Sequence, residues 1–255
     1  MISAAAKKSK EEFLRDLKLY AMGGVEERVE EMIARRCAGE PIAYVLGEWE
    51  FLGLPMEVEP GVLIPRPDTE VLAELAIRLV RSRDGGARVL DLCCGSGCVG
   101  VVIAKNVGDC RVILVDNSLK ALRLSRQNVL RNNVTRNTTC IEADAMSAPP
   151  MLLGKFDLIV SNPPYVPTAE IPALDASVKD FEPREALDGG ADGLDFYRAI
   201  IPRWKTILKE RGVFLFECGE GQAQDIADML RTEGFSKTAV HKDTRGTPRV
   251  VAGIM

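Results

Sequence analysis

The sequence predicts an α/β fold in which a mostly parallel sheet carries helices on both of its faces. From about residue 67 onward, short apolar runs alternate with amphipathic segments of helical length, and this alternation is typical of parallel sheets. A strand–glycine turn–helix unit at 88–104 is the second observation. The third is that successive predicted strands end at or near acidic residues.

The region before the sheet divides into two smaller parts. Residues 11–37 carry two apolar stripes at helical spacing, interrupted at Gly23-Gly24, and such stripes predict amphipathic helices. We therefore predict a helical domain at 1–45, a linking β-hairpin at 46–66 and one larger domain at 67–255. Two interpretations of the helices stay open: they pack on the larger domain, or they dock a substrate.

Within the larger domain the order of elements can be followed along the chain. Asp68 is placed to cap a helix, whose apolar stripe follows it directly. A late apolar run at 213–216 predicts the fifth strand of the sheet. Segments 236–241 and 248–253, joined by a turn that contains Gly246, predict an antiparallel hairpin that closes the sheet.

The first strand of the larger domain leads into a candidate ligand site. The strand at 88–92 includes Asp91 and is followed by a tight turn, Cys93-Cys94-Gly95-Ser96-Gly97, where glycines let the backbone approach a ligand closely. The second strand ends in Asp116, whose carboxylate could accept both hydroxyls of a ribose. The third ends near Asp144, where a carboxylate could meet an adenine amino group. Acidic strand ends suit a nucleoside that carries no phosphate.

A nicotinamide-binding fold is the rival interpretation of this half. The run from Gly95 to Gly100 matches G-x-G-x-x-G, and Asp116 follows downstream. An enzyme of that class also needs hydride chemistry, usually with a proton donor. The chain has one histidine, His241, near its C-terminus. The sequence therefore favours a nicotinamide cofactor less than a nucleoside that carries no phosphate.

The most informative motif is Asn162-Pro163-Pro164-Tyr165, which follows a predicted buried strand at 156–161. Its two prolines stop the strand and stiffen the backbone beyond it. The Asn162 side chain and the carbonyl at Pro163 offer hydrogen-bond acceptors, and Tyr165 offers a flat ring. This combination predicts a holder for a planar –NH2 group that reacts at nitrogen. The alternative is a strand-ending turn without a chemical role.

A long segment with little regular pattern, 166–194, follows this motif directly. Loops of this length inside compact domains are usually functional or disordered. We interpret the segment as a wall or lid over the acceptor site. The alternative is a disordered insertion.

Six blocks of this chain resemble the class I S-adenosylmethionine-dependent methyltransferases, and within them the HemK/PrmC protein-(glutamine-N5) methyltransferases. The resemblance runs from about Ala38 to the C-terminus. Its blocks are Gly39-Glu40-Pro41-Ile42-Ala43-Tyr44, Gly47-Glu48-Trp49-Glu50-Phe51, Leu63-Ile64-Pro65-Arg66-Pro67-Asp68-Thr69-Glu70, Asp91-Leu92-Cys93-Cys94-Gly95-Ser96-Gly97, Asn162-Pro163-Pro164-Tyr165 and Phe181-Glu182-Pro183-Arg184-Glu185-Ala186-Leu187. The third block looks like the release-factor branch more than the branch that modifies a ribosomal protein.

This resemblance implies a seven-stranded Rossmann-like sheet and a specific reaction. A methyl group would pass from S-adenosyl-L-methionine to the side-chain amide nitrogen of the glutamine in the Gly-Gly-Gln motif of peptide chain release factors, with S-adenosyl-L-homocysteine as product. The alternatives are another amino acceptor, namely a ribosomal-protein glutamine or adenine N6 of a nucleic acid, and a cofactor-binding module without catalysis. The intact Asn-Pro-Pro-Tyr motif argues against the last of these.

The resemblance also implies site residues, position by position. The acceptor amide would meet the catalytic residues Asn162, Pro163, Pro164 and Tyr165. The cofactor would be bound by Asp91, Cys93, Cys94, Gly95, Ser96, Gly97, Asp116, Asp144, Ala145 and Asn162. This chain departs from the family pattern in having cysteines in the turn. It also has Ala145 where relatives often carry an aromatic residue.

Charge and cysteine content limit the partners and the compartment. The net charge is −4, whereas a protein that binds duplex nucleic acid usually has a basic footprint, so nucleic acid is an unlikely partner. The odd number of cysteines, seven, and their place in apolar runs indicate reduced thiols and a cytoplasmic protein. Cys93, Cys94 and Cys98 lack a nearby histidine or a second cysteine pair, so we expect no metal site.

The sequence also predicts no association with a membrane. The first ten residues lack an apolar signal core, and no apolar run approaches membrane-spanning length.

Overall fold

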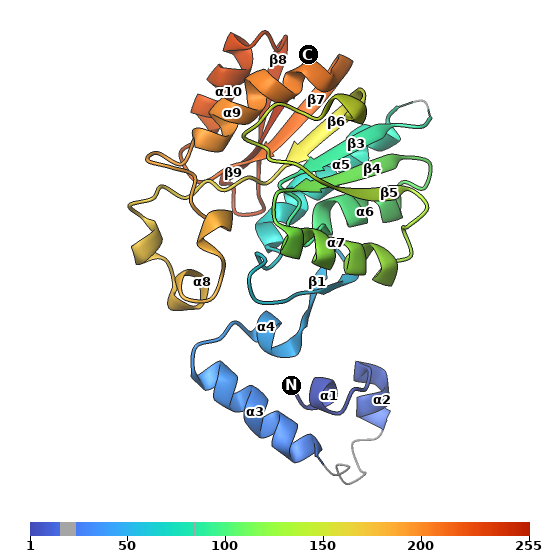
Figure 1. Ribbon diagram of the computed structural model, residues 1–255, viewed down its shortest axis with the longest axis vertical. Helices are drawn as coiled ribbons and strands as arrows, with labels where there is room; N and C mark the ends of the chain where they lie inside the picture. The colour runs from blue at the N-terminus through green and yellow to red at the C-terminus, as the bar shows by residue number, and fades with distance from the viewer. Residues whose placement is uncertain (16–23, 84) are drawn as a thin grey trace.

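The computed structural model describes residues 1–15, 24–83 and 85–255 of the chain. Part of the first predicted N-terminal helix and Gly23 of its break lie outside the described residues. Figure 1 shows an α/β body built on one twisted sheet, with a smaller group of helices below it.

The sheet has seven strands in the order β5-β4-β3-β6-β7-β9-β8. Five of them are parallel neighbours: β3 (Arg88–Leu92), β4 (Arg111–Asp116), β5 (Thr138–Glu142), β6 (Phe156–Ser161) and β7 (Leu208–Glu217). The last two, β8 (Lys237–Lys242) and β9 (Pro248–Ile254), form an antiparallel hairpin, and β9 pairs with β7. The predicted fold class is confirmed.

Alternating side chains along each strand build two apolar cores, one on each face of the sheet. Val89 and Leu158 belong to one core, whereas Leu90 and Ile159 belong to the other. The first core is covered by α5 (Glu70–Arg81), α6 (Cys98–Asn106) and α7 (Leu119–Arg131). The second is covered by α9 (Asp195–Trp204) and α10 (Ala223–Thr232). Helices therefore lie on both faces (Figure 1).

In the described residues before the hairpin, the N-terminal part has three helices and a connection. The helices are α1 (Ile2–Ala5), α2 (Lys10–Arg15) and α3 (Val25–Cys37), and α4 (Ile42–Leu46) leads into the hairpin of β1 (Glu48–Phe51) and β2 (Leu54–Glu57). The hairpin is fixed to α7, because the Glu57 N–H donates to Asn128 Oδ1 (2.6 Å) and Asn128 Nδ2 donates to the Glu57 carbonyl (3.1 Å).

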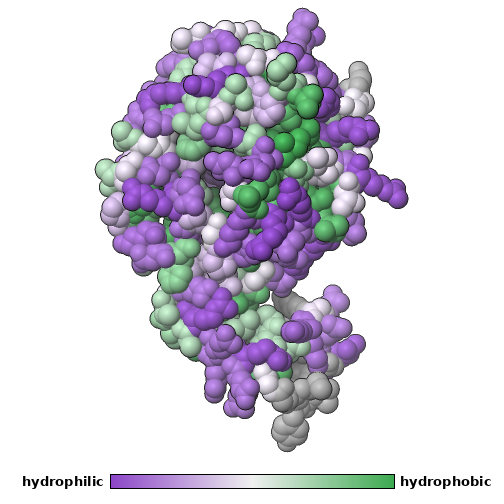
Figure 2. Space-filling view, viewed as in Figure 1, coloured by the Kyte–Doolittle hydropathy of each residue, from purple (hydrophilic) through white to green (hydrophobic). Residues whose placement is uncertain are grey.

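Helix α3 has far less support than the hairpin. Val25 is its one buried residue, and Ile33 is 48% exposed. Figure 2 shows the N-terminal helices as a lobe below the main body. A helix that packs on a larger domain usually buries an apolar stripe against it, and α3 buries only Val25, while both interpretations of the N-terminal helices stay predictions.

Segment 166–194 has a defined path, so the interpretation as a disordered insertion is wrong. It contains the short helices η3 (Ile171–Ala173), α8 (Ala176–Lys179) and η4 (Arg184–Ala186). It leaves and returns at the same place, since the Val166 N–H donates to the Leu187 carbonyl (2.9 Å) and the Gly189 N–H donates to the Val166 carbonyl (2.9 Å). The remaining short helical turns of the chain are η1 (Pro67–Thr69), η2 (Met151–Leu153) and η5 (Lys205–Ile207).

Candidate active site

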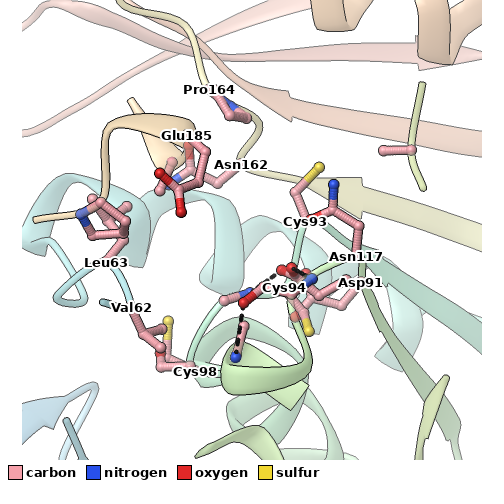
Figure 3. A pocket seen from close by; sticks show the side chains of 18 of the residues that line it. Val62, Leu63, Asp91, Cys93, Cys94, Cys98, Asn117, Asn162, Pro164 and Glu185 are labelled. Atoms are coloured by element: carbon pink, nitrogen blue, oxygen red, sulfur yellow. Dashed lines mark hydrogen bonds between the residues drawn. The ribbon is translucent and has the colours of Figure 1, made fainter. Parts of the chain in front are cut away.

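A cavity of about 450 Å³ lies beyond the carboxyl ends of β3, β4 and β6. This volume falls in the range of small-molecule binding sites, and parallel α/β sheets bind their ligands at this edge. Its lining includes residues that the sequence predicts for the site: Asp91, Cys93, Cys94, Gly95, Ser96, Asp116, Asp144, Ala145, Asn162 and Pro164. Figure 3 shows that Asp91 and the turn after it lie on one side of the cavity, while Asn162, Pro164 and Glu185 lie on another.

The turn after β3 owes its shape to three residues with positive φ: Cys93 at 60°, Gly95 at 54° and Gly97 at 77°. This region favours glycine, so Cys93 is strained where a glycine would not be. Gly97 precedes α6 and does not line the cavity. A Cβ there would lie 3.0 Å from Leu114 Cδ1, so Gly97 provides close packing of the turn against β4.

Two carboxylates beside this turn are held by backbone N–H groups. Asp91 Oδ2 accepts from Gly100 (2.8 Å), and Asp116 accepts from Gly95 at Oδ2 (2.9 Å) and from Ser118 at Oδ1 (2.9 Å). Burial raises the pKa of Asp91 to about 7 and also raises the pKa of Asp116. These carboxylates have fixed positions, and each oxygen keeps capacity for a further hydrogen bond.

Asp144, the third acidic residue near a strand end, also lines this cavity. Asp144 accepts hydrogen bonds from the Met146 N–H (2.9 Å) and the Ser147 hydroxyl (2.8 Å). Ala145 is buried, and its carbonyl accepts from Trp204 Nε1 (2.9 Å). Asn117 and Phe196 also line the cavity, and no local pattern in the sequence marks them as site residues. Phe196 adds an aromatic surface from α9, a helix whose place beside the cavity depends on the tertiary fold.

The Asn-Pro-Pro-Tyr motif presents only part of itself to the cavity. Asn162 and Pro164 line it, whereas Pro163 and Tyr165 are not among its lining residues. Asn162 Nδ2 donates to Thr69 Oγ1 at 3.3 Å. The Tyr165 carbonyl accepts from Gln222 Nε2 (2.8 Å), and a Cβ at Gly219 would lie 3.1 Å from the Tyr165 ring.

The remaining wall joins two segments that are distant in the sequence. One is 61–66, which precedes η1, and the other is 183–186 from the long segment. Buried Glu182 connects them, because its carboxylate accepts from the Ile64 N–H (3.1 Å) and forms an ion pair with Arg66. Segment 166–194 therefore supplies a wall of the cavity. Arg66 and Glu182 belong to two separate motifs of the sequence, and local patterns do not predict the ion pair between them.

Within 1–15, 24–83 and 85–255, no group of three His, Cys, Asp or Glu side chains is placed to hold a metal ion. Burial raises the pKa of the thiols of Cys93, Cys94 and Cys98, so they are neutral near pH 7. No helix among the described residues is long and apolar enough to cross a membrane.

Comparisons with solved structures support the fold. The catalytic domain of hMettl16 superposes with a TM-score of 0.65 and 16% identity, covering 83% of this chain and 80% of that one. A methyltransferase from Pyrococcus furiosus superposes with a TM-score of 0.57 and 18% identity, covering 91% of this chain and 98% of that one. At these identities the likeness concerns the fold alone.

Comparisons with known sequences show the family. The descriptions "Methyltransferase small domain" and "PrmC N-terminal domain" match residues 70–176 and 1–47. The release factor glutamine methyltransferase of Geobacter sulfurreducens is 43% identical over 222 residues, 87% of this chain and 76% of the relative. That of Clostridium acetobutylicum is 41% identical over 214 residues, 84% and 75%. With this fold and these relatives, the chain belongs to the release factor glutamine methyltransferases.

Proposed function

We propose that the cavity is the site where this protein methylates the glutamine of the Gly-Gly-Gln motif in peptide chain release factors, at its side-chain nitrogen. Family membership establishes the reaction class, a protein-glutamine methyltransferase. The observation that carries the assignment is the position of Asn162, at the end of β6 and facing the same cavity as Asp91 and Asp116. An amide held at Asn162 would share one enclosed space with a ligand held at the two carboxylates.

The cofactor in this proposal is S-adenosyl-L-methionine, and the residues present fit it. Asp116 would accept the ribose hydroxyls, because each of its oxygens makes one backbone hydrogen bond and retains a lone pair. Asp144 and Ala145 would border the adenine, and Cys93 to Ser96 would border the methionine part, with Gly97 shaping the turn behind them. When bound, this cofactor supplies a methyl group on a positively charged sulfur and leaves as S-adenosyl-L-homocysteine.

The protein's task at the acceptor is to orient a weak nucleophile. An amide nitrogen is a poor nucleophile because its lone pair is delocalised into the carbonyl. Hydrogen bonds from its two N–H groups to Asn162 Oδ1 and the Pro163 carbonyl would fix its orientation. They would also favour the positive charge that develops on nitrogen. Positioning and preorganised electrostatics of this kind account for much of enzymatic rate enhancement. This mechanism needs no dedicated general base, since the proton on the methylated nitrogen becomes very acidic.

Binding of the protein substrate would extend beyond the cavity. We assign residues 1–45 to a docking domain, 46–66 to the linking hairpin and 67–255 to the methyltransferase domain. The exposed surface of α3 supports this division, because Ile33 is an apolar side chain that remains about half exposed in the described chain. The partner is a release factor, which places the protein in the cytoplasm.

One experiment separates this function from its alternatives. The protein is incubated with methyl-labelled S-adenosylmethionine and, in parallel, with a release factor, the same factor with its Gly-Gly-Gln glutamine replaced by alanine, a ribosomal-protein mixture and DNA. We expect label only on the intact factor. Label on the alanine variant would show that another residue is modified, and label on ribosomal protein or DNA would identify a different acceptor.

A further inference from the structure

Behind the acceptor motif lies a buried carboxyl group that the reaction described so far does not use. Glu217 is the last residue of β7, and β7 runs parallel to β6 with Ser161 opposite Phe216. Asn162 and Glu217 therefore leave the sheet side by side. Glu217 is paired with Val250 of β9, and its carbonyl accepts a hydrogen bond from the Tyr197 hydroxyl (2.7 Å), so its backbone is fixed in place.

The environment of this carboxyl group is unusual for a buried acid. Glu217 is 0% exposed, and neither of its oxygens has a hydrogen-bond partner of good geometry. The side chains of Thr69 and Asn162 lie against it and favour its charged form. Burying a carboxyl group without a partner costs free energy, so its presence beside the acceptor motif calls for a role.

Arg249 lies close enough to Glu217 to affect its charge, but it makes no hydrogen bond to the Glu217 carboxyl group. Arg249 favours the charged form of Glu217, but its own hydrogen bonds and ion pairs go elsewhere. Its Nη2 lies 3.2 Å from Asp68 Oδ2 and 3.7 Å from Asp243 Oδ2, and its Nη1 donates to the Cys218 carbonyl (3.3 Å). The Arg249 Nε–H is buried without a hydrogen-bond partner, and neither it nor the Nη atoms bond to Glu217, so the Glu217 carboxyl group can still accept a hydrogen bond from another neighbour.

Asn162 is that donor. Its Nδ2 carries two hydrogens, and one of them is donated to Thr69 Oγ1 at 3.3 Å. The amino end of the Asn162 amide therefore points toward Thr69 and Glu217. A flipped amide would place Oδ1 against a carboxylate, which repels it.

We propose that Glu217 is a positioning residue: its carboxylate accepts the second Nδ2 hydrogen of Asn162 and thereby keeps Asn162 Oδ1 turned toward the acceptor amide. This inference rests on the proposed function of Asn162. A carboxylate–carboxamide–amide chain also polarises each hydrogen bond in it, so the negative charge on Glu217 would make Asn162 Oδ1 a stronger acceptor. That is the property that a delocalised amide nitrogen requires from its partner.

The arrangement would depend on pH. Burial raises the pKa of Glu217 to about 7, against the opposing effects of Thr69, Arg249 and Asn162. Asp68 acts in the same direction as burial, while Asp68 is itself paired with Arg245 and Arg249. A protonated carboxyl group carries an O–H donor, which attracts Asn162 Oδ1 as well as Nδ2. The preference for one amide orientation would then be lost.

Three variants test this with the full-length enzyme. Glu217→Leu removes every acceptor, and we expect its kcat at pH 8 to fall roughly tenfold to a hundredfold, less than for direct loss of a polar group at a reacting centre. Its KM for release factor and its affinity for the cofactor should remain within about twofold. Glu217→Gln keeps the shape but does not titrate, so the fall in kcat below pH 7 should become smaller, with only the part due to Asp91 in the same cavity remaining. Asp243→Asn is the matched control, because Asp243 also faces Arg249 but does not contact Asn162, and it should behave as wild type.

A second readout does not require activity. The protein is labelled with ¹⁵N-asparagine, and the side-chain NH2 signal of Asn162 is identified by its loss in Asn162→Ala. This signal should shift with a midpoint near pH 7 in the wild type and should not shift in Glu217→Gln.

The outcomes distinguish the two proposals. An Asn162 signal that does not change with pH, a Glu217→Leu enzyme with normal kcat, or an acid limb of kcat that is unchanged in Glu217→Gln would each overturn the role of Glu217. A wild type that titrates as expected but transfers no methyl group to release factor would instead contradict the proposed function.

Discussion

The acidic groups at the two ends of the cavity differ in how well they are hydrogen-bonded. At the end formed by β3 and β4, Asp91 and Asp116 accept three backbone hydrogen bonds of 2.8–2.9 Å. At the end formed by β6 and β7, Asn162 makes one side-chain hydrogen bond of 3.3 Å, and both oxygens of Glu217 lack a partner. The first end is held in shape by its own backbone, whereas at the second end the Asn162 amide keeps hydrogen-bonding capacity for a substrate and Glu217 lies buried behind it.

This difference predicts different consequences of substitution at the two ends. Changes near Asp116 should act mainly on binding of the cofactor, because that site is formed before any ligand arrives. Changes near Asn162 should act mainly on turnover, because those polar groups complete their hydrogen bonds with the acceptor. Substitutions at each end test whether cofactor binding and turnover can be changed independently.

The largest effect is expected for Asn162→Ala. We expect kcat to fall by about 100-fold or more, the scale for removing one preorganised polar group at a reacting centre. Calorimetry should show nearly unchanged cofactor affinity, since Asn162 acts mostly on the acceptor amide. A variant that methylates release factor at a near-normal rate would contradict the mechanism.

Next is a gain of stability for Glu217→Gln. Burial raises the pKa of Glu217 from 4.5 to about 7, so the folded state retains a proton that the unfolded state releases as the pH rises from 4.5 to 7. This group therefore lowers stability progressively over that window, and its cost is complete above pH 7. At pH 8 the variant should be more stable, by up to about 3 kcal/mol, and near pH 4 it should match the wild type. Urea unfolding with the same pH dependence for both proteins would contradict the raised pKa.

A comparable effect on binding is expected for Asp116→Ala. Loss of a charge-assisted hydrogen bond should weaken S-adenosylmethionine binding by about 1.5–3 kcal/mol, measured by calorimetry. Asp116→Asn is the matched variant, because one oxygen can still accept from Gly95, and it should lose less. Unchanged affinity would remove Asp116 from the site, and tight binding of NADH instead would overturn the cofactor assignment.

The smallest effect concerns docking on α3. Ile33→Glu should raise KM several-fold for intact release factor, on the scale of about 1 kcal/mol for one uncovered apolar side chain. It should leave KM unchanged for a short Gly-Gly-Gln peptide. Leu130→Glu is the control, since Leu130 is similarly exposed (64%) but lies on α7. Equal behaviour of factor and peptide in the Ile33 variant would mean that this face of α3 does not bind the substrate.

Local patterns in the sequence predict the strands and the ligand-binding edge, because buried parallel strands are short apolar runs and the turn after β3 is marked by glycines. Local patterns do not predict contacts between residues that are distant in the sequence. The start of β7 at Leu208 was missed, because Lys209, Glu210 and Arg211 lack an apolar pattern, yet Leu208 pairs with Phe156. Glu217 was missed for the same reason, since its neighbour Asn162 is set by the order of the strands.

One feature of the architecture bears on how such an enzyme changes its target. The helices α1 to α3 join the sheet domain through α4 and one short hairpin, and that hairpin is anchored on α7 by the side chain of Asn128. The residues that would perform the reaction and those that would dock the substrate thus lie in separate parts of the chain, which a short segment connects. Replacing the part before the hairpin would give the same amide chemistry a different protein to act upon.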